Sequence, residues 1–401
     1  IEALIENQTI LFRMLRIGRR YLHLRSTLAR KRFVTTTACF IWGNNSNGNL
    51  GLGIDSPSVL SPTKLESPED GSAITSVSCG LNHSALITET GNVFTWGKNK
   101  YSELGHGDTA TRSRPTKVEA LSNIVQVSCG DSHTLALDKS GCVWSWGWGG
   151  GKWISQGALG HGDKEHQKLP KKIEGLDTVI SISSGSAHSL AVTESKQLFA
   201  WGNGEHGRLG TIPGILQLQS ASRPTLVDYF LRMKVVSAVA MGSFSAAVTE
   251  CQKLYMWGRN DHNQLGTGGL TLDIYNVENV PNHVRSKDGE DFRVTQVACS
   301  PRHSVSVNED GEVYSWGDRL YMQPVLTENI PKVRFVSAGS RATLCITEDN
   351  QLLSWGKDGA VCLGHGSDYG VAEPTVVEAF KDFSVSKLFC GPNSAAAIVT
   401  I

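Results

Sequence analysis

The 401-residue sequence has no uncharged apolar run approaching 18 residues, no Cys-x-x-Cys pair and no net charge. Without such an apolar run, no transmembrane helix is expected. Nine cysteines are an odd number, and no His/Cys/Asp spacing resembles a zinc site. We therefore predict buried structural thiols in a reducing compartment, with no metal and no cofactor.

Motifs of common catalytic sites are also missing. The sequence contains no P-loop and no nucleophile elbow, and nothing marks a Ser-His-Asp arrangement. We therefore predict no catalytic residues. Hydrophobic residues make up 40% of the chain and charged residues 19%, which excludes a disordered chain.

The charges are unevenly distributed along the chain. Residues 1–39 hold eight Lys or Arg but two Asp or Glu, so the remainder is acidic, which argues against sequence-independent binding to nucleic acid. From Met14, arginines alternate with leucines and hydroxyl residues without any acid, which is typical of a mitochondrial transit peptide. We predict that residues 1–39 are a basic targeting segment, with a transit peptide that starts at Met14 and directs the protein to the mitochondrial matrix. The alternative is a nuclear signal or a nucleic-acid-binding arm.

A Trp-Gly dipeptide recurs about every 50 residues, in a constant context. Cys-Gly-x-x-His-Ser/Thr and a short apolar segment precede it, and Leu-Gly-x-Gly and a proline-containing segment follow it. Residues before Trp-Gly alternate between apolar and polar, as in a half-buried strand, and Gly-containing hairpin turns precede them. The prolines are expected to open a further strand. Four short strands per repeat predict a propeller blade. The tryptophans are Trp42, Trp96, Trp146, Trp201, Trp257, Trp316 and Trp355, and the prolines are Pro62, Pro115, Pro170, Pro224, Pro281 and Pro374.

On these motifs, residues 40–401 resemble the regulator of chromosome condensation family, which implies an all-β, seven-bladed β-propeller. Independently of the family, residues 39–43 and 389–401 are complementary parts of one repeat. We predict that Ala395–Ile401 pairs antiparallel with Cys39–Trp42 and closes the ring. A monomer is expected.

Three places break the repeat. Residues 148–163 form an insertion that carries Trp148 and Trp153, which are either partner-binding anchors or side chains folded over the propeller edge. Residues 318–333 have lost Leu-Gly-x-Gly, which predicts a trimmed loop. Residues 271–294 are charged and rich in turn formers, and a surface loop is expected there.

Histidines recur at one repeat position, where they are interpreted as structural hydrogen-bonding groups. They are His83, His133, His188 and His303, and the other repeats are aligned there with Ser245, Ala342 and Ser394.

The resemblance implies two activities that can be compared with the residues. The founding member is a guanine nucleotide exchange factor. Asp131 and His303 match positions of its exchange surface, whereas the remaining positions, at Ala187 and at Asn393 or Ser394, are not kept. The plant ultraviolet-B photoreceptor uses tryptophans in Gly-Trp-Arg-His-Thr motifs. Those tryptophans are absent from the corresponding motifs of this chain, so we do not expect photoreception.

The sequence as a whole predicts a non-catalytic propeller scaffold that binds a protein or ribonucleoprotein partner in mitochondria, such as a GTPase or a mitoribosomal or RNA-processing assembly. A guanine nucleotide exchange factor for a small or organellar GTPase and a nuclear chromatin-associated protein are the alternatives. The candidate partner-binding residues are Asp131, His133, Trp148, Trp153 and His303.

Overall fold

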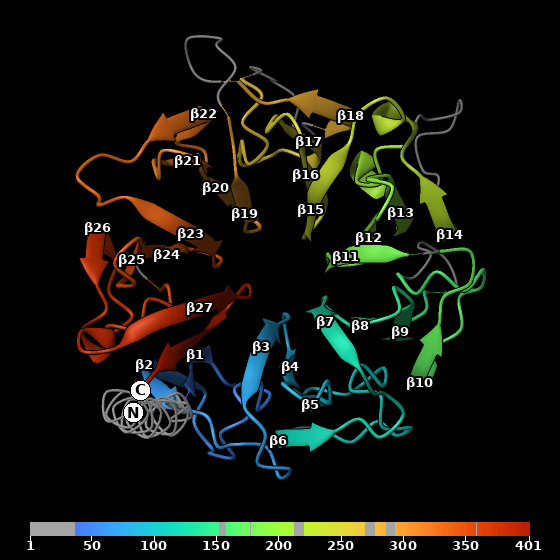
Figure 1. Ribbon diagram of the computed structural model, residues 1–401, viewed down its shortest axis with the longest axis horizontal. Helices are drawn as coiled ribbons and strands as arrows, with labels where there is room; N and C mark the ends of the chain where they lie inside the picture. Colours follow the sequence, from blue (N-terminus) through green and yellow to red (C-terminus); the bar gives the residue numbers. More distant parts are fainter. Residues whose placement is uncertain are drawn as a thin grey trace, which may run out of the picture. The chain divides into compact units, whose positions relative to one another are not determined.

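The computed structural model describes residues 37–151, 158–176, 178–211, 220–268, 277–285, 293–357 and 359–401. These residues form seven four-stranded antiparallel sheets that surround a common centre (Figure 1). The all-β, seven-bladed propeller predicted from the sequence is thus confirmed. The helical elements in these ranges are three short 3₁₀ turns, η1 (Glu205–Gly207), η2 (Asp228–Phe230) and η3 (Glu378–Phe380).

Six blades consist of four consecutive strands, of which the first lies nearest the centre (Figure 1). Blade 1 contains β3 (Ile74–Cys79), β4 (His83–Thr88), β5 (Val93–Gly97) and β6 (Arg112–Lys117). Blade 2 contains β7 (Ile124–Cys129), β8 (His133–Asp138), β9 (Val143–Gly147) and β10 (Gln167–Lys172). Blade 3 contains β11 (Val179–Ser184), β12 (His188–Thr193), β13 (Leu198–Gly202) and β14 (Ala221–Leu226).

The next three blades repeat this order. Blade 4 contains β15 (Val235–Met241), β16 (Phe244–Thr249), β17 (Leu254–Arg259) and β18 (Val277–His283). Blade 5 contains β19 (Gln296–Cys299), β20 (His303–Val307), β21 (Val313–Gly317) and β22 (Tyr321–Leu326). Blade 6 contains β23 (Val333–Ala338), β24 (Ala342–Thr347), β25 (Leu352–Gly356) and β26 (Val371–Val376).

Blade 7 joins the two ends of the propeller. Its order from the centre outward is β27 (Ser384–Cys390), β28 (Ser394–Thr400), β1 (Thr37–Asn44) and β2 (Ser58–Lys64). β1 and β28 pair in continuous antiparallel register, with Ile41 opposite Ala396 and Trp42 opposite Ala395. The predicted closure of the ring is confirmed, and it removes the two strand edges that would otherwise be exposed.

The core lies between neighbouring blades, and a repeated contact that we call the Trp–carbonyl junction joins them. Tryptophan Nε1–H donates to the carbonyl that precedes Leu-Gly in the previous blade. In the junction between blades 7 and 1, Gly51 faces Trp96, and a Cβ added to Gly51 would lie 2.8 Å from Nε1 of Trp96. The bonds are Trp42 to Cys362 (2.8 Å), Trp96 to Asn49 (2.9 Å), Trp146 to Glu103 (2.8 Å), Trp201 to Ala158 (2.7 Å), Trp257 to Arg208 (3.0 Å) and Trp316 to Gln264 (2.8 Å).

Two expectations need correction. The prolines do not open the fourth strands; they lie inside them, as Pro115 does in β6, where the register to β5 shifts between Thr95 and Gly97. A proline fits there because this outermost strand leaves one side of its backbone unpaired. Residues 271–294, expected to be a surface loop, contain the strand β18.

The cysteines are free, and six of the nine are buried. Burial raises the pKa of the thiols of Cys79 to about 11 and of Cys299 to about 12, which keeps them protonated. The predicted structural thiols are confirmed, with Cys251 as an exposed exception.

The glycine at the junction can be tested with a matched pair. Gly51 and Gly71 have nearly the same backbone φ, +72° and +67°, but no atom lies within 4 Å of a Cβ at Gly71. Gly71→Ala is expected to cost about 1 kcal/mol from left-handed backbone strain. Gly51→Ala should cost about 3 kcal/mol, because a Cβ there also displaces the Trp96 ring. Urea unfolding of both variants measures the difference, and equal costs would contradict the junction.

Candidate functional site

One end of the propeller gathers the residues singled out in the sequence. In each blade the turn between the first and second strands and the loop between the third and fourth strands lie at the same end, since the strands alternate in direction. We call this end the loop face. In blade 2 it carries the turn at Asp131 and the loop that begins at Trp148, and the Trp148 N–H donates to the Ser132 carbonyl (2.8 Å). The structure therefore brings the Asp131 turn and the start of the insertion together.

Asp131 is half-buried in its turn. Burial raises the pKa of its carboxyl to about 6, and the positive charge of Arg208 acts in the opposite direction. Arg208 itself is 3% exposed and is held by Glu205, whose carbonyl accepts from Nε (2.7 Å), and by Ser186, whose hydroxyl accepts from Nη1 (3.4 Å). Asp131 is thus a half-buried acid with a pKa of about 6 that lies within electrostatic range of the fixed Arg208 guanidinium.

His133 and His303 have structural contacts between blades. Nε2 of His133 contacts the Ser189 hydroxyl of blade 3 (3.2 Å), and Nε2 of His303 contacts the Thr343 hydroxyl of blade 6 (3.0 Å). Burial lowers the pKa of His133 to about 3 and of His303 to about 4, so both rings are neutral at physiological pH. His133 is 1% exposed, whereas His303 is half-buried.

The alignment of the histidine position requires one correction. In blade 4, Phe244 lies opposite Gly258, as His133 lies opposite Gly147, so Phe244 and not Ser245 occupies the histidine position. Ser245 instead provides the hydroxyl that contacts Nε2 of His188 (2.9 Å). The sequence could not separate the two residues because it shows no partner for either.

The insertion in blade 2 is anchored on blade 1. The ring of Trp148 lies 6.5 Å from that of Tyr101, and the Tyr101 ring also contacts His166 (5.5 Å). The N–H of Gly149 donates to Nδ1 of His166 (3.0 Å). Trp148 is half-buried in this way, and Trp153 lies outside the described residues.

Sequence reasoning missed a group of charged side chains on the loop face. Arg259 pairs with Asp261 (2.7 Å), Lys357 pairs with Asp318, and Arg302 is exposed. A signal for them existed, because Arg259, Asp318 and Lys357 each directly follow Trp-Gly, as Trp148 does. That position projects from the end of the third strand onto the loop face.

The described part of the chain contains no cluster of three or more His, Cys, Asp or Glu side chains that could hold a metal ion. Within the same ranges, no helix has the length and apolarity that crossing a membrane requires. The side chains that the loop face presents include the charged Asp131 and Arg302 and the aromatic Trp148.

Seven four-stranded blades around a common centre define the class of seven-bladed β-propellers. The chain belongs to the family described as RCC1-like domain, whose model matches residues 38–397.

Relatives in this family differ in their roles. The chain is 32% identical to the Ultraviolet-B receptor UVR8 of Arabidopsis thaliana, with 84% of the chain and 77% of the relative covered. It is 30% identical to the secretion-regulating guanine nucleotide exchange factor of Mus musculus (93% and 86% covered), and 31% identical to the mitochondrial RCC1 domain-containing protein RUG3 of Arabidopsis thaliana (80% and 78% covered). The crystal structure of Prp20p from Saccharomyces cerevisiae shares the fold, with a TM-score of 0.79 at 24% identity and 92% of each chain covered.

The buried histidines make the stability of the propeller dependent on pH. An unfolded histidine takes up a proton near pH 6.5, whereas His133 in the folded protein does so near pH 3. Between these values the unfolded state binds more protons, so stability falls as the pH falls, by about 1.4 kcal/mol per pH unit for each such histidine. Asp131 acts oppositely, because its raised pKa lets the folded state bind a proton below about pH 6.

His133→Gln tests this dependence, because glutamine does not titrate. The free energy of unfolding is measured with urea at pH 7, 6 and 5. It should fall less steeply with falling pH in the variant, and the difference in slope should approach the value for one proton, about 1.4 kcal/mol per pH unit. Parallel curves for the variant and the wild-type protein would mean that the pKa of His133 is the same in the folded and unfolded states, which would contradict the lowered pKa.

Proposed function

We propose that this protein is a non-catalytic propeller scaffold that binds a protein or ribonucleoprotein partner through its loop face in mitochondria. The observation that carries the proposal is a difference between two sets of polar groups, one between the blades and one on the loop face. His133 and His303 are neutral and contact hydroxyl groups of the next blade. Asp131, Trp148 and Arg302 are instead at least partly exposed on the loop face. Groups fixed on strand ends and exposed on one face suit binding better than acid–base catalysis.

The partner is a protein such as a GTPase, or a mitoribosomal or RNA-processing assembly. Support comes from the relatives: one is named a guanine nucleotide exchange factor, and the Prp20p structure is described together with binding to Gsp1p and histones. Support for mitochondria comes from the basic segment at 1–39 and from the relative RUG3, which is named mitochondrial.

A second candidate function is guanine nucleotide exchange. The specific observation in its favour is Asp131, which matches an exchange residue of the family and is half-buried on the loop face, within electrostatic range of Arg208. A carboxylate in that place could compete with the bound nucleotide for the groups of a GTPase that hold the nucleotide. In this case the protein would act on the GTPase through binding alone, with no covalent step.

Asp131→Asn separates binding by this face from binding elsewhere. It removes the charge and keeps the shape, so the partner recovered from isolated mitochondria by affinity purification and mass spectrometry should be lost or reduced about tenfold. The matched control is Glu194→Gln, an exposed acid in the β12–β13 turn at the opposite end of the propeller. Equal loss in both variants, or in neither, would contradict a partner site at Asp131.

The same pair of variants tests nucleotide exchange. Release of a fluorescent guanine nucleotide from candidate organellar GTPases should be accelerated by the wild-type protein and by Glu194→Gln, and not by Asp131→Asn. If no GTPase responds to the wild-type protein, exchange is excluded for the GTPases tested and the scaffold proposal remains.

The targeting segment is tested by imaging the full chain and a chain that starts at Thr37, where β1 begins. We expect the full chain in mitochondria and the shortened chain outside them, because 1–36 carries the basic residues. A nuclear signal from both chains would instead favour the chromatin-associated alternative.

A further inference from the structure

The junction between blades 5 and 6 lacks the loop that fills the other six. After Gly317 the chain turns through Asp318–Leu320 directly into β22, so no Leu-Gly segment faces Trp355. Trp355 is half-buried, whereas the other six repeat tryptophans are at most 1% exposed. Within the described ranges, Trp355 Nε1 makes no hydrogen bond of the kind that Trp316 Nε1 makes to the Gln264 carbonyl.

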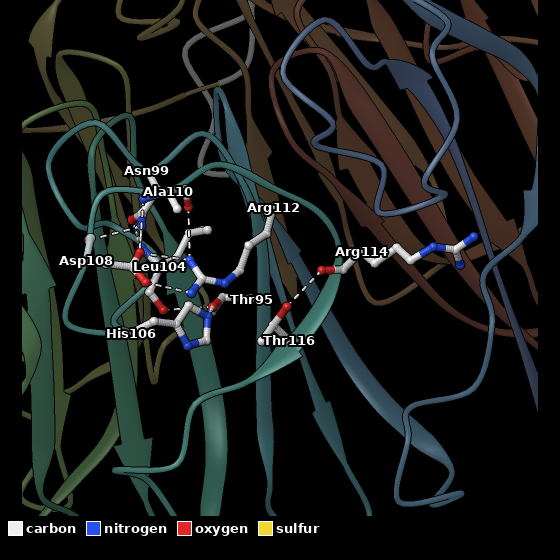
Figure 2. A network of polar contacts seen from close by, with 9 residues as sticks. All are labelled: Thr95, Asn99, Leu104, His106, Asp108, Ala110, Arg112, Arg114 and Thr116. Carbon is white, nitrogen blue, oxygen red and sulfur yellow. Dashed lines mark hydrogen bonds and ion pairs between the residues drawn. The ribbon is translucent and has the colours of Figure 1, made fainter.

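An intact loop shows what is missing, and Figure 2 shows that of blade 1. The hydroxyl of Thr95 donates to the Leu104 carbonyl (2.7 Å) and contacts His106 (2.9 Å). The side chain of Asn99 closes the turn, since its Oδ1 accepts from the Leu104 N–H (2.9 Å) and its Nδ2 donates to the Asp108 carbonyl (3.1 Å). The turn from Asn99 to Asp108 is therefore organised by its own contacts.

The next blade contacts this turn through three groups. Trp146 Nε1 and the Thr134 hydroxyl both donate to the Glu103 carbonyl, each at 2.8 Å. The Gly107 N–H donates to the Lys168 carbonyl of β10 (3.0 Å). With the Thr95 hydroxyl, four groups thus recognise the backbone of Glu103–Gly107, whose sequence is Xaa-Leu-Gly-Xaa-Gly.

All four groups have counterparts between blades 5 and 6. Trp355 lies opposite Thr343, as Trp146 lies opposite Thr134. Ser315 precedes Trp316 as Thr95 precedes Trp96, and Ala372 stands two residues before a proline, as Lys168 does. The counterparts Trp355, Thr343, Ser315 and Ala372 line one cavity.

That cavity has a volume of about 950 Å³, which lies in the range of ligand pockets. Its rim is apolar and open, since Leu320 is 64% exposed, Tyr321 48% and Leu326 43%. In the filled junctions the leucine of the loop is buried, as Leu104 is at 0%. An exposed apolar rim around groups whose counterparts bind a loop backbone in the filled junctions indicates a missing occupant.

We propose that this cavity binds a turn of a partner protein with the sequence Xaa-Leu-Gly-Xaa-Gly, which takes the place of the absent loop. The Xaa carbonyl accepts from Trp355 and Thr343, the Leu carbonyl accepts from Ser315, and the N–H of the second Gly donates to the Ala372 carbonyl. The first Gly is required because a Cβ at the equivalent Gly105 would lie 2.8 Å from Nε1 of Trp146. The six filled junctions of this chain define the occupant, and the site is independent of the proposed partner site at Asp131.

A peptide with the sequence of Asn99–Asp108, cyclised through a short linker and labelled with fluorescein, is the probe. Its binding to the full protein is measured by fluorescence anisotropy, and we expect saturable binding. Trp355→Phe should weaken binding about fivefold, because one hydrogen bond is lost. The control Trp146→Phe makes the same change at a filled junction and should leave affinity unchanged. A peptide in which Val replaces the first Gly should not bind.

A second experiment does not depend on tryptophan variants. Replacing Asp318–Leu320 with the Asn99–Asp108 sequence fills the cavity within the chain, so it should abolish peptide binding and raise the unfolding temperature. In the wild-type protein labelled with ¹⁵N, the indole signal of Trp355, identified by its loss in Trp355→Phe, should shift when peptide is added. The proposal is overturned if the peptide at about 1 mM leaves that signal unmoved, or if the filled protein binds the peptide as well as the wild type does.

Discussion

The hydrogen bond between a tryptophan Nε1–H and a backbone carbonyl of the preceding blade is the contact on which the ring depends. Between blades 6 and 7 it joins Trp42 to Cys362, residues 320 positions apart, at 2.8 Å. Buried at 0% exposure, the indole N–H must find an acceptor, and the glycine beside the ring lets the acceptor's backbone approach. A single residue type therefore contributes packing area, a polar contact and a geometric limit on the distance between blades.

Most of the polar groups that recur among the repeats take part either in this contact or in histidine–hydroxyl hydrogen bonds between blades. The ring of His188 contacts Ser245, and the Ser245 hydroxyl in turn donates to the Arg208 carbonyl (2.8 Å) that also accepts from Trp257. One carbonyl thus connects a histidine, a hydroxyl and a tryptophan across two blades. Residues with a repeated role hold the ring together, and the residues available for recognition are those that depart from the repeat.

The sequence therefore predicts the scaffold better than the site. Trp-Gly and Leu-Gly-x-Gly predict seven blades and the closure at Trp42, because each pattern reports local strand and turn geometry that every blade needs. Two features were missed: Phe244 takes the place of the repeat histidine in blade 4, and residues 277–283 form a strand. Both depend on register, and register depends on a pairing partner that a single strand does not reveal. Arg208 was missed because its contacts arise between loops: Ser186 lies in another loop of blade 3, and Asp131, whose pKa Arg208 affects, lies in a turn of blade 2.

Loss of one loop does not open the ring, and the reason lies in the layered structure of each junction. Near the centre, the side chain of Gln296 exchanges two hydrogen bonds with the backbone of Val336, both at 3.0 Å. Gln126 makes the same pair of bonds with Ile182 at a junction that keeps its loop (2.9 and 3.0 Å). The inner half of the junction between blades 5 and 6 is therefore intact, while its outer half is open. Because every blade is also held from its other side in a closed ring, the outer half of one junction is free to become a binding site without loss of the fold.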